Sequence, residues 1–180
     1  DQVLQAIKEA DEGAGVFMVI KNYSGDIMNF EMAQEMAEME GIEVASVVVD
    51  DDIAVEDSLY TQGRRGVAGT ILVHKILGDA ARAGKSLTEI KALADELVKS
   101  IHTVGLALSG ATVPEVGKPG FVLADDEIEF GIGIHGEPGY RKEKMQPSKD
   151  LAKELVEKLS QSVELKSGKK IGILINGMGA

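Results

Sequence analysis

The chain has 180 residues, of which 44% are hydrophobic and 27% are charged, a balance typical of a globular protein and not of a disordered or collagen-like chain. A formal net charge of −11 argues against nucleic acid and against an anionic membrane surface as partners. The absence of cysteine excludes disulfides, thiolate catalysis and cysteine-bearing metal centres. Without cysteines the chain is indifferent to the redox compartment, so a cytoplasmic location is the default expectation. No apolar run approaches the roughly 20 residues of a membrane helix, so no membrane span is expected.

The first hundred residues predict helices and strands in alternation. Residues 3–7 carry apolar side chains on one helical face, and the apolar run 15–20 is typical of a strand buried on both faces. Methionines about four apart predict a helix over 28–40, and a second strand is expected at 43–49. This β-α-β order requires a crossover and favours a parallel pair of strands.

Two further helices are expected before the pattern changes. Apolar spacing predicts one over 66–84, and the series from Ser86 to Glu89 fits a capping box at the start of the next. After about residue 102 the pattern turns to strands, and a soft domain boundary is expected there. We therefore expect an α/β protein whose first domain, residues 1–102, is a layered parallel-strand sheet and whose second, residues 103–180, is a smaller α+β domain.

The second domain is expected to contain several short strands and one helix. Strands are predicted at 104–108, twice within 121–134 around two aspartates, and at 171–175, with a helix at about 148–160. Residues 112–120, between the first two of these ranges, form a loop rich in proline and glycine.

The loop from Lys21 to Asp26 is the first candidate site. It follows a predicted parallel strand and precedes a helix, the place where ligands collect in open α/β sheets. Asp26 is therefore either the N-cap of that helix or a catalytic carboxylate. Lys21 taken alone is more typical of a solvated cation.

His135 is the second candidate. It lies within Gly131–Gly139 at the end of an apolar strand, with a glycine immediately after it, so that a small ligand could approach the ring closely. A neutral imidazole can act as a base, a metal ligand or a nucleophile toward a carbonyl carbon. The other histidines, His74 on a helix and His102 at a helix end, lack metal-ligand spacing to it, and a cationic His102 would be favoured by the helix dipole.

Two other clusters have weaker functional signals. The three aspartates 50–52 could bind Mg²⁺, but successive strand residues point to opposite faces, so a solvated or capping role is favoured. The glycine-rich series 63–69 precedes a helix and could hold an anion there, although it lacks the P-loop pattern. No nucleotide-binding motif is found, so ATP is not expected to bind to this chain.

Five motifs, in order along nearly the whole chain, resemble the dihydroxyacetone kinase family, specifically its DhaK-type substrate-binding subunit. They are Lys21-Asn22-Tyr23-Ser24-Gly25-Asp26, Asp50-Asp51-Asp52-Ile53-Ala54-Val55, Gly63-Arg64-Arg65-Gly66-Val67-Ala68-Gly69, Thr112-Val113-Pro114 with Gly117-Lys118-Pro119, and Gly133-Ile134-His135-Gly136-Glu137-Pro138-Gly139.

The resemblance implies a two-domain homodimer that binds dihydroxyacetone for phosphorylation. It implies that His135 forms a covalent hemiaminal with the carbonyl carbon of the ketone and that Asp26 acts on the hydroxyl that receives phosphate. It places Lys21 in the substrate pocket. No cofactor is expected on this chain, because the resemblance implies that Mg²⁺ and ADP or ATP are carried by a DhaL-type subunit or a fused domain.

The resemblance also marks a difference from the family. Family members carry an upstream glycine-rich segment with an acid/base histidine, and they continue beyond the point that matches the end of this sequence. Because neither part is in this sequence, the chain is expected to be an internal fragment. The family also includes coactivators that sense dihydroxyacetone without transferring phosphate. The kinase component is the leading hypothesis, and the coactivator is the alternative.

Overall fold

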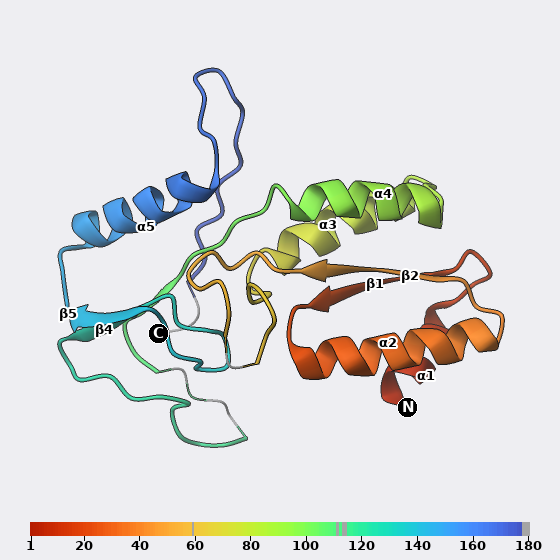
Figure 1. Cartoon of the computed structure of the whole chain (residues 1–180), viewed down its shortest axis with the longest axis horizontal. Coiled ribbons are helices and arrows are strands. Elements are labelled where there is room, and N and C mark those ends of the chain that lie inside the picture. Colours follow the sequence, from red (N-terminus) through yellow and green to blue (C-terminus); the bar gives the residue numbers. More distant parts are fainter. Residues whose placement is uncertain (59, 111, 113–114, 178–180) are drawn as a thin grey trace. The chain divides into compact units, whose positions relative to one another are not determined.

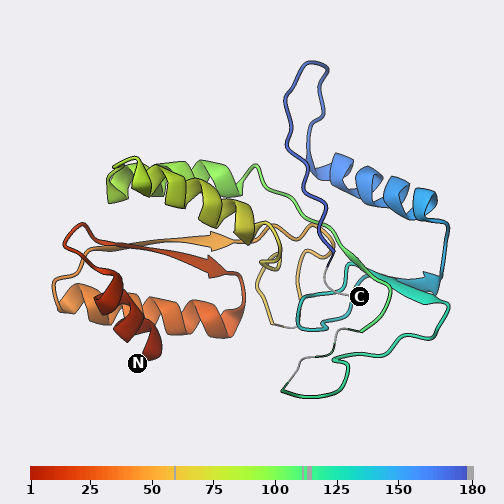
Figure 2. The ribbon, with the colours of Figure 1, turned by 180° about the vertical axis from the view of Figure 1, so that it is seen from behind.

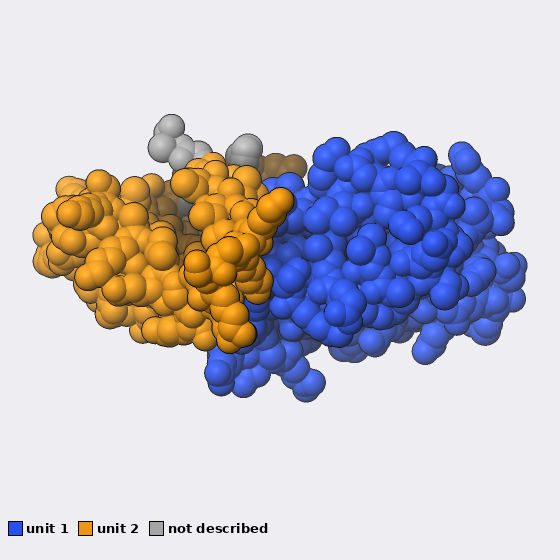
Figure 3. Space-filling model, turned by 90° about the horizontal axis from the view of Figure 1, so that it is seen from above, with its two compact units in different colours: residues 1–52, 56–103 blue, residues 53–55, 104–180 orange. Residues whose placement is uncertain are grey.

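The computed structural model describes residues 1–58, 60–110, 112 and 115–177. The chain folds into two compact units, coloured separately in Figure 3. Unit 1 comprises residues 1–52 and 56–103, and unit 2 comprises residues 53–55 and 104–180. The expected boundary near residue 102 concerns domains and stays a prediction.

Unit 1 is built on a parallel pair of strands, as the β-α-β pattern predicted. Strand β1 (Val16–Lys21) pairs with β2 (Val44–Val49), with Val16 opposite Val44 and Lys21 opposite Val49. Helices α1 (Gln2–Ala10) and α2 (Ser24–Met39) cover one face of this sheet, and α3 (Thr70–Arg82) and α4 (Leu87–Val98) cover the other (Figure 1).

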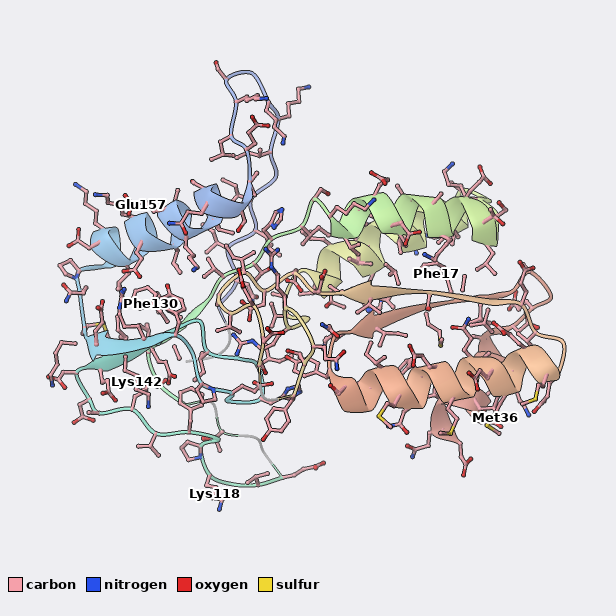
Figure 4. The ribbon with its side chains drawn as sticks, viewed as in Figure 1. Phe17, Met36, Lys118, Phe130, Lys142 and Glu157 are labelled. Carbon is pink, nitrogen blue, oxygen red and sulfur yellow. The ribbon has the colours of Figure 1, made fainter. Side chains whose placement is uncertain are left out.

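The alternation of side chains along β1 explains why both faces are covered. Met18 and Ile20 belong to the core against α1 and α2, while Phe17 and Val19 pack against the core formed with α3 and α4. In Figure 4, Phe17 lies on the α4 side of the strands and Met36 extends from α2. A strand buried on both faces needs a nearly continuous apolar sequence, which is why this strand could be predicted.

Unit 2 contains a short antiparallel sheet and one helix. Strands β3 (Leu106–Ala107), β4 (Glu127–Phe130) and β5 (Arg141–Lys144) pair in that order. Helix α5 (Ser148–Ser162) contributes Leu151 to a core with Ile128 and Phe130, both fully buried. The reverse view in Figure 2 shows the same connections. The fold is thus mixed α/β, with a parallel sheet and a separate antiparallel one.

Two strand predictions in unit 2 are wrong. Residues 121–123 and 171–175 form no strand, although both ranges are apolar. Ile173 and Ile175 are 78% and 93% exposed, and no described segment pairs with them. An apolar run becomes a strand only when a neighbour accepts and donates its backbone hydrogen bonds, and local sequence cannot supply that neighbour.

Helix α3 begins later than predicted, at Thr70 and not at Gly66. The cause is the buried carboxylate of Asp51, whose Oδ1 accepts from the backbone N–H of Val67 at 2.8 Å and whose Oδ2 accepts from that of Gly69 at 2.7 Å. These bonds hold residues 67–69 as a turn ahead of the helix. No helix among the described residues is long and apolar enough to cross a membrane.

Candidate functional site

His135 lies in a tight loop between β4 and β5. The N–H of Gly133 donates to the carbonyl oxygen of Glu137 at 2.9 Å, and that of Gly136 donates to the carbonyl of Gly133 at 3.1 Å. Gly136 has φ +84°, a left-handed conformation that favours glycine, and a Cβ at Gly139 would lie 1.9 Å from the carbonyl oxygen of Phe130. The glycines therefore allow a turn that leaves the side chain of His135 63% exposed to solvent.

Glu137 is the residue that holds this imidazole, and the sequence analysis did not single it out. Its carboxylate is 3% exposed, and its Oε1 lies 3.1 Å from Nδ1 of His135, while Oε2 accepts from the backbone N–H of His135 at 2.9 Å. Burial would raise the pKa of Glu137, but the hydrogen bonds from its own backbone and from His135 together lower it below the usual 4.5. The group is therefore an ionised carboxylate at neutral pH.

The ionised state of Glu137 determines the tautomer of His135. A carboxylate can only accept hydrogen bonds, so the Nδ1 that faces it carries the proton. The lone pair of the neutral ring is then on Nε2, which is the arrangement a nucleophilic imidazole requires. The sequence offered one signal for this pair, because Glu137 is the second residue after His135.

Lys21 and Asp26 both belong to unit 1 and follow one another in the chain at the carboxyl end of β1. Lys21 is the last residue of the strand, and Asp26 is in the first turn of α2; both are exposed. The N-cap of α2 is Tyr23, so of the two alternatives for Asp26, N-cap or catalytic carboxylate, the N-cap is wrong. An acidic side chain in the first turn still interacts favourably with the helix dipole.

Residues 62–66 form a loop that packs against the ends of β1 and β2. The side-chain Nδ2 of Asn22 donates to the carbonyl oxygens of Gln62 and Arg64 at 2.8 and 2.7 Å. A Cβ at Gly66 would lie 2.4 Å from the carbonyl oxygen of Val49 and 2.8 Å from Cα of Lys21, so only glycine permits this approach. The glycine-rich series thus packs against the strand ends.

A carboxylate of the same chain occupies the anion site that was expected at the start of α3. The N–H groups of Val67 and Gly69 bind the carboxylate of Asp51, as described above. Asp52 is also buried and lies 2.7 Å from the guanidinium of Arg65, which is fully buried. A solvated or capping role was expected for the three aspartates, and the exposed Asp50 fits the solvated one. Asp51 and Asp52 are buried, and Asp51 fits the capping one because its carboxylate accepts from backbone N–H groups just ahead of α3.

The other two histidines differ from each other. His74 is on α3, where a helix was predicted, and its side chain is exposed. His102 is half-buried beyond the end of α4, and burial and then the charge of Arg64 lower its pKa, which opposes the cation that the helix dipole would favour. Within the described residues no group of three acidic or histidine side chains could hold a metal ion.

The chain as a whole matches the Dak1 domain over residues 1–180. It belongs to the Dak1 domain family. It is 70% identical over 180 residues to the PTS-dependent dihydroxyacetone kinase, dihydroxyacetone-binding subunit DhaK, of Lactococcus lactis, covering 100% of this chain and 54% of that protein. The coactivator DhaQ of the same organism is 47% identical over 180 residues, covering 99% and 55% of the two chains.

The same family appears among solved structures. The dihydroxyacetone kinase of C. freundii superposes with a TM-score of 0.80 at 36% identity, covering 89% of this chain and 29% of that one. This Dak1 chain spans about half the length of the curated relatives it matches. Lys21 and Asp26 belong to unit 1 and His135 to unit 2; their assembly into one site therefore stays a prediction.

Proposed function

We propose that this chain is the dihydroxyacetone-binding part of a dihydroxyacetone kinase. The single observation that carries the proposal is the His135–Glu137 pair, a loop histidine whose Nδ1 faces a buried carboxylate and whose ring is open to solvent. The relative at 70% identity, described as a dihydroxyacetone-binding subunit, supports the choice of ketone.

The proposed covalent step follows from the tautomer of His135. The Nε2 lone pair forms a bond to the carbonyl carbon, the π electrons of the C=O bond move to oxygen, and that oxygen takes a proton from water. The ring becomes positively charged and is stabilised by the carboxylate of Glu137, which accepts from Nδ1–H. Glycerol has no carbonyl carbon, so this tether would discriminate against it where size could not.

The tethered ketone would then present a terminal hydroxyl for phosphorylation. Asp26 is proposed to accept the proton of that hydroxyl, and Lys21 to lie in the substrate pocket. The Mg²⁺ and the ADP or ATP are proposed to be carried by a DhaL-type subunit or fused domain. A homodimer is part of the same proposal.

Native mass spectrometry of the full-length protein with dihydroxyacetone tests the covalent step. The wild type should gain the mass of one ketone per chain, and His135→Ala should lose that gain because the nucleophilic nitrogen is gone. His74→Ala removes an exposed imidazole and is the matched control. Retention of the gain in His135→Ala would end the covalent proposal.

The role of Asp26 is tested by separating binding from transfer. In Asp26→Asn the ketone adduct should persist, while phosphoryl transfer from a phosphorylated donor subunit should slow by about a hundredfold, the usual contribution of a general base. Equal loss of adduct and transfer would show that Asp26 is structural.

The coactivator is the second candidate, favoured by the relative at 47% identity. It shares the proposed ketone binding, so binding cannot separate the two. Turnover can, because a phosphorylated triose should form when the full-length protein, the phosphorylated donor subunit and dihydroxyacetone are combined. Ketone adduct without this product would favour the coactivator.

A further inference from the structure

Unit 1 contains a cavity of about 290 Å³ beyond the carboxyl end of β2. Its lining residues are the apolar Val48, Val98 and Ile101 and the polar Asn22, Asp50, Arg64, Lys99 and His102. Lys21 and Asp26 are not among its lining residues. Its size lies near the lower end of small-molecule pockets, which suits a metabolite of a few carbons.

Arg64 is a cation of this cavity whose charge is not balanced by an ion pair among the described residues. Its side chain is half-buried, yet among the described residues its guanidinium makes no ion pair or hydrogen bond, although the chain carries 30 acidic side chains. The neighbouring Arg65 shows the contrast, because its Nε and Nη2 lie 2.8 and 2.7 Å from Oδ2 of Asp52. A half-buried guanidinium without an anion is costly unless a ligand supplies one.

His102, which also lines the cavity, has a matching feature. Its Nδ1 is buried and has no hydrogen-bond partner among the residues that the structure describes. Burial is the first cause that lowers its pKa and the charge of Arg64 the second, while Asp50 and Asp51 act in the opposite direction. The imidazole is thus neutral, and a bound anion would satisfy its nitrogen and favour its protonated form.

The remaining charges leave the cavity attractive to anions. Lys99 is a second cation, although its Nζ pairs with Glu96 at 2.7 Å. Asp50 is the one carboxylate among the lining residues, and it forms no ion pair among the described residues. Nearby, Asp51 is occupied by the backbone of Val67 and Gly69.

We propose that this cavity binds a small phosphate ester, with the phosphate between the guanidinium of Arg64 and the imidazole of His102. The planar guanidinium donates two parallel hydrogen bonds to an oxyanion, which suits phosphate. Val98 and Ile101 contact the carbon skeleton, and Asp50 accepts a hydrogen bond from one of its hydroxyl groups. The site uses unit 1 alone and is separate from the residues of the proposed function.

Proton NMR of the three imidazole rings tests the site, since the chain has only three histidines. The signals are assigned with His74→Gln and His102→Gln, and the full chain is titrated with glycerol 3-phosphate at constant ionic strength. The His102 signal should move in a saturable way and titrate at higher pH when the ester is present. The exposed His74 should not respond.

The choice of probe distinguishes the ester from its parts. Inorganic phosphate should bind more weakly than glycerol 3-phosphate, because it lacks the hydroxyl that Asp50 would accept and the carbons that Val98 would contact. Glycerol alone should leave His102 unchanged. Equal binding of inorganic phosphate and the ester would overturn the assignment of an ester, and no saturable shift with either would overturn the site.

Substitution of Arg64 tests whether its guanidinium binds the phosphate. Arg64→Gln should weaken binding by about tenfold to a hundredfold, the usual worth of a hydrogen bond to a charged group. Arg82→Gln is the matched control, because that exposed arginine lies on α3 and pairs with Asp79. Unchanged binding in Arg64→Gln would overturn the proposal.

A second variant covers the case in which Arg64→Gln does not fold. Arg64→Lys keeps the charge but loses the paired donors, so it should lose part of the affinity, and wild-type affinity in it would count against the proposal. The ketone adduct at His135 is a separate readout. Its loss without loss of phosphate binding would remove the proposed function and leave this site intact.

Discussion

The pairing of His135 with Glu137 shows how one buried carboxylate can fix the chemistry of an exposed ring. Two hydrogen bonds reach Glu137 from His135, one from the ring and one from the backbone. The hydrogen bond from the backbone N–H of His135 positions the carboxylate of Glu137. The hydrogen bond from the ring then places the ring proton on Nδ1. The exposed imidazole can therefore present Nε2 in one tautomer without being buried itself.

Replacing Glu137 with Gln tests this coupling. The amide of Gln can donate to Nδ1, which would move the ring proton to Nε2 and remove the lone pair that attacks the ketone. The rate of adduct formation with dihydroxyacetone should fall by about a hundredfold or more, as expected when a histidine is held in the wrong tautomer. Stopped mass-spectrometric time points measure this rate.

The control for Glu137→Gln is Glu157→Gln. Glu157 is on α5 of the same unit, and Figure 4 labels it on that helix. Its loss should leave the adduct rate unchanged. An unchanged rate in Glu137→Gln as well would mean that the tautomer does not depend on this carboxylate.

For single residues, properties that depend on neighbours in the sequence could be predicted, whereas burial by residues far along the chain could not. His135 was identified because glycines around it left little bulk, a local property. Glu137 was missed because its burial comes from the fold of the loop. The burial of Asp51 and Asp52 was not predicted for the same reason, because it depends on the packing of residues 65–69 against them, although the capping alternative fits Asp51.

Among the elements, those with strong local signals were predicted well. Strands β1 and β2 could be predicted because burial on both faces requires continuous apolar residues. Helix α4 could be predicted because the residues of its capping box, Ser86 and Glu89, can be recognised from their spacing in the sequence. The failures at 121–123 and 171–175 have one cause, because an apolar run does not reveal whether a partner strand exists.

The capping box of α4 gives a prediction for an element. The backbone N–H of Glu89 donates to the hydroxyl of Ser86, and Glu89 accepts from the backbone N–H of Ser86 at 2.9 Å. In Ser86→Ala the free energy of unfolding should fall by about 1 kcal/mol, because the N–H of Glu89 loses its partner. Urea denaturation measures the change.

Ser160→Ala is the control for the cap. The hydroxyl of Ser160 donates to the carbonyl of Val156 within α5, where alanine is the better helix former. This variant should be as stable as the wild type or slightly more so. Equal destabilisation of both variants would show that the cap contributes nothing specific.

For the whole molecule, titration should destabilise the fold in two separate ranges of pH. His102 has a lowered pKa in the folded chain, so below its usual 6.5 the unfolded chain binds more protons and stability falls. The carboxyls of Asp79, Glu89, Asp126 and Glu137 also have lowered pKa values. Their contributions are present above the usual 3.8 or 4.5 and are lost as pH falls through the folded values.

The urea midpoint measured from pH 8 to pH 3 should therefore fall first below about 6.5 and again below about 4.5. His102→Gln should remove the first decrease. His74→Gln should keep it, because the ring of His74 is exposed and its removal leaves the buried ring of His102 in place.

In 1 M salt the exposed pairs of Asp79 and Asp126 should contribute less to the second decrease, since the screening length is then about 3 Å. The buried Glu137 is screened less, so Glu137→Gln should flatten most of the decrease that persists in salt. A midpoint that stays constant from pH 7 to pH 5.5 in the wild type would contradict the burial of a neutral His102 in unit 1.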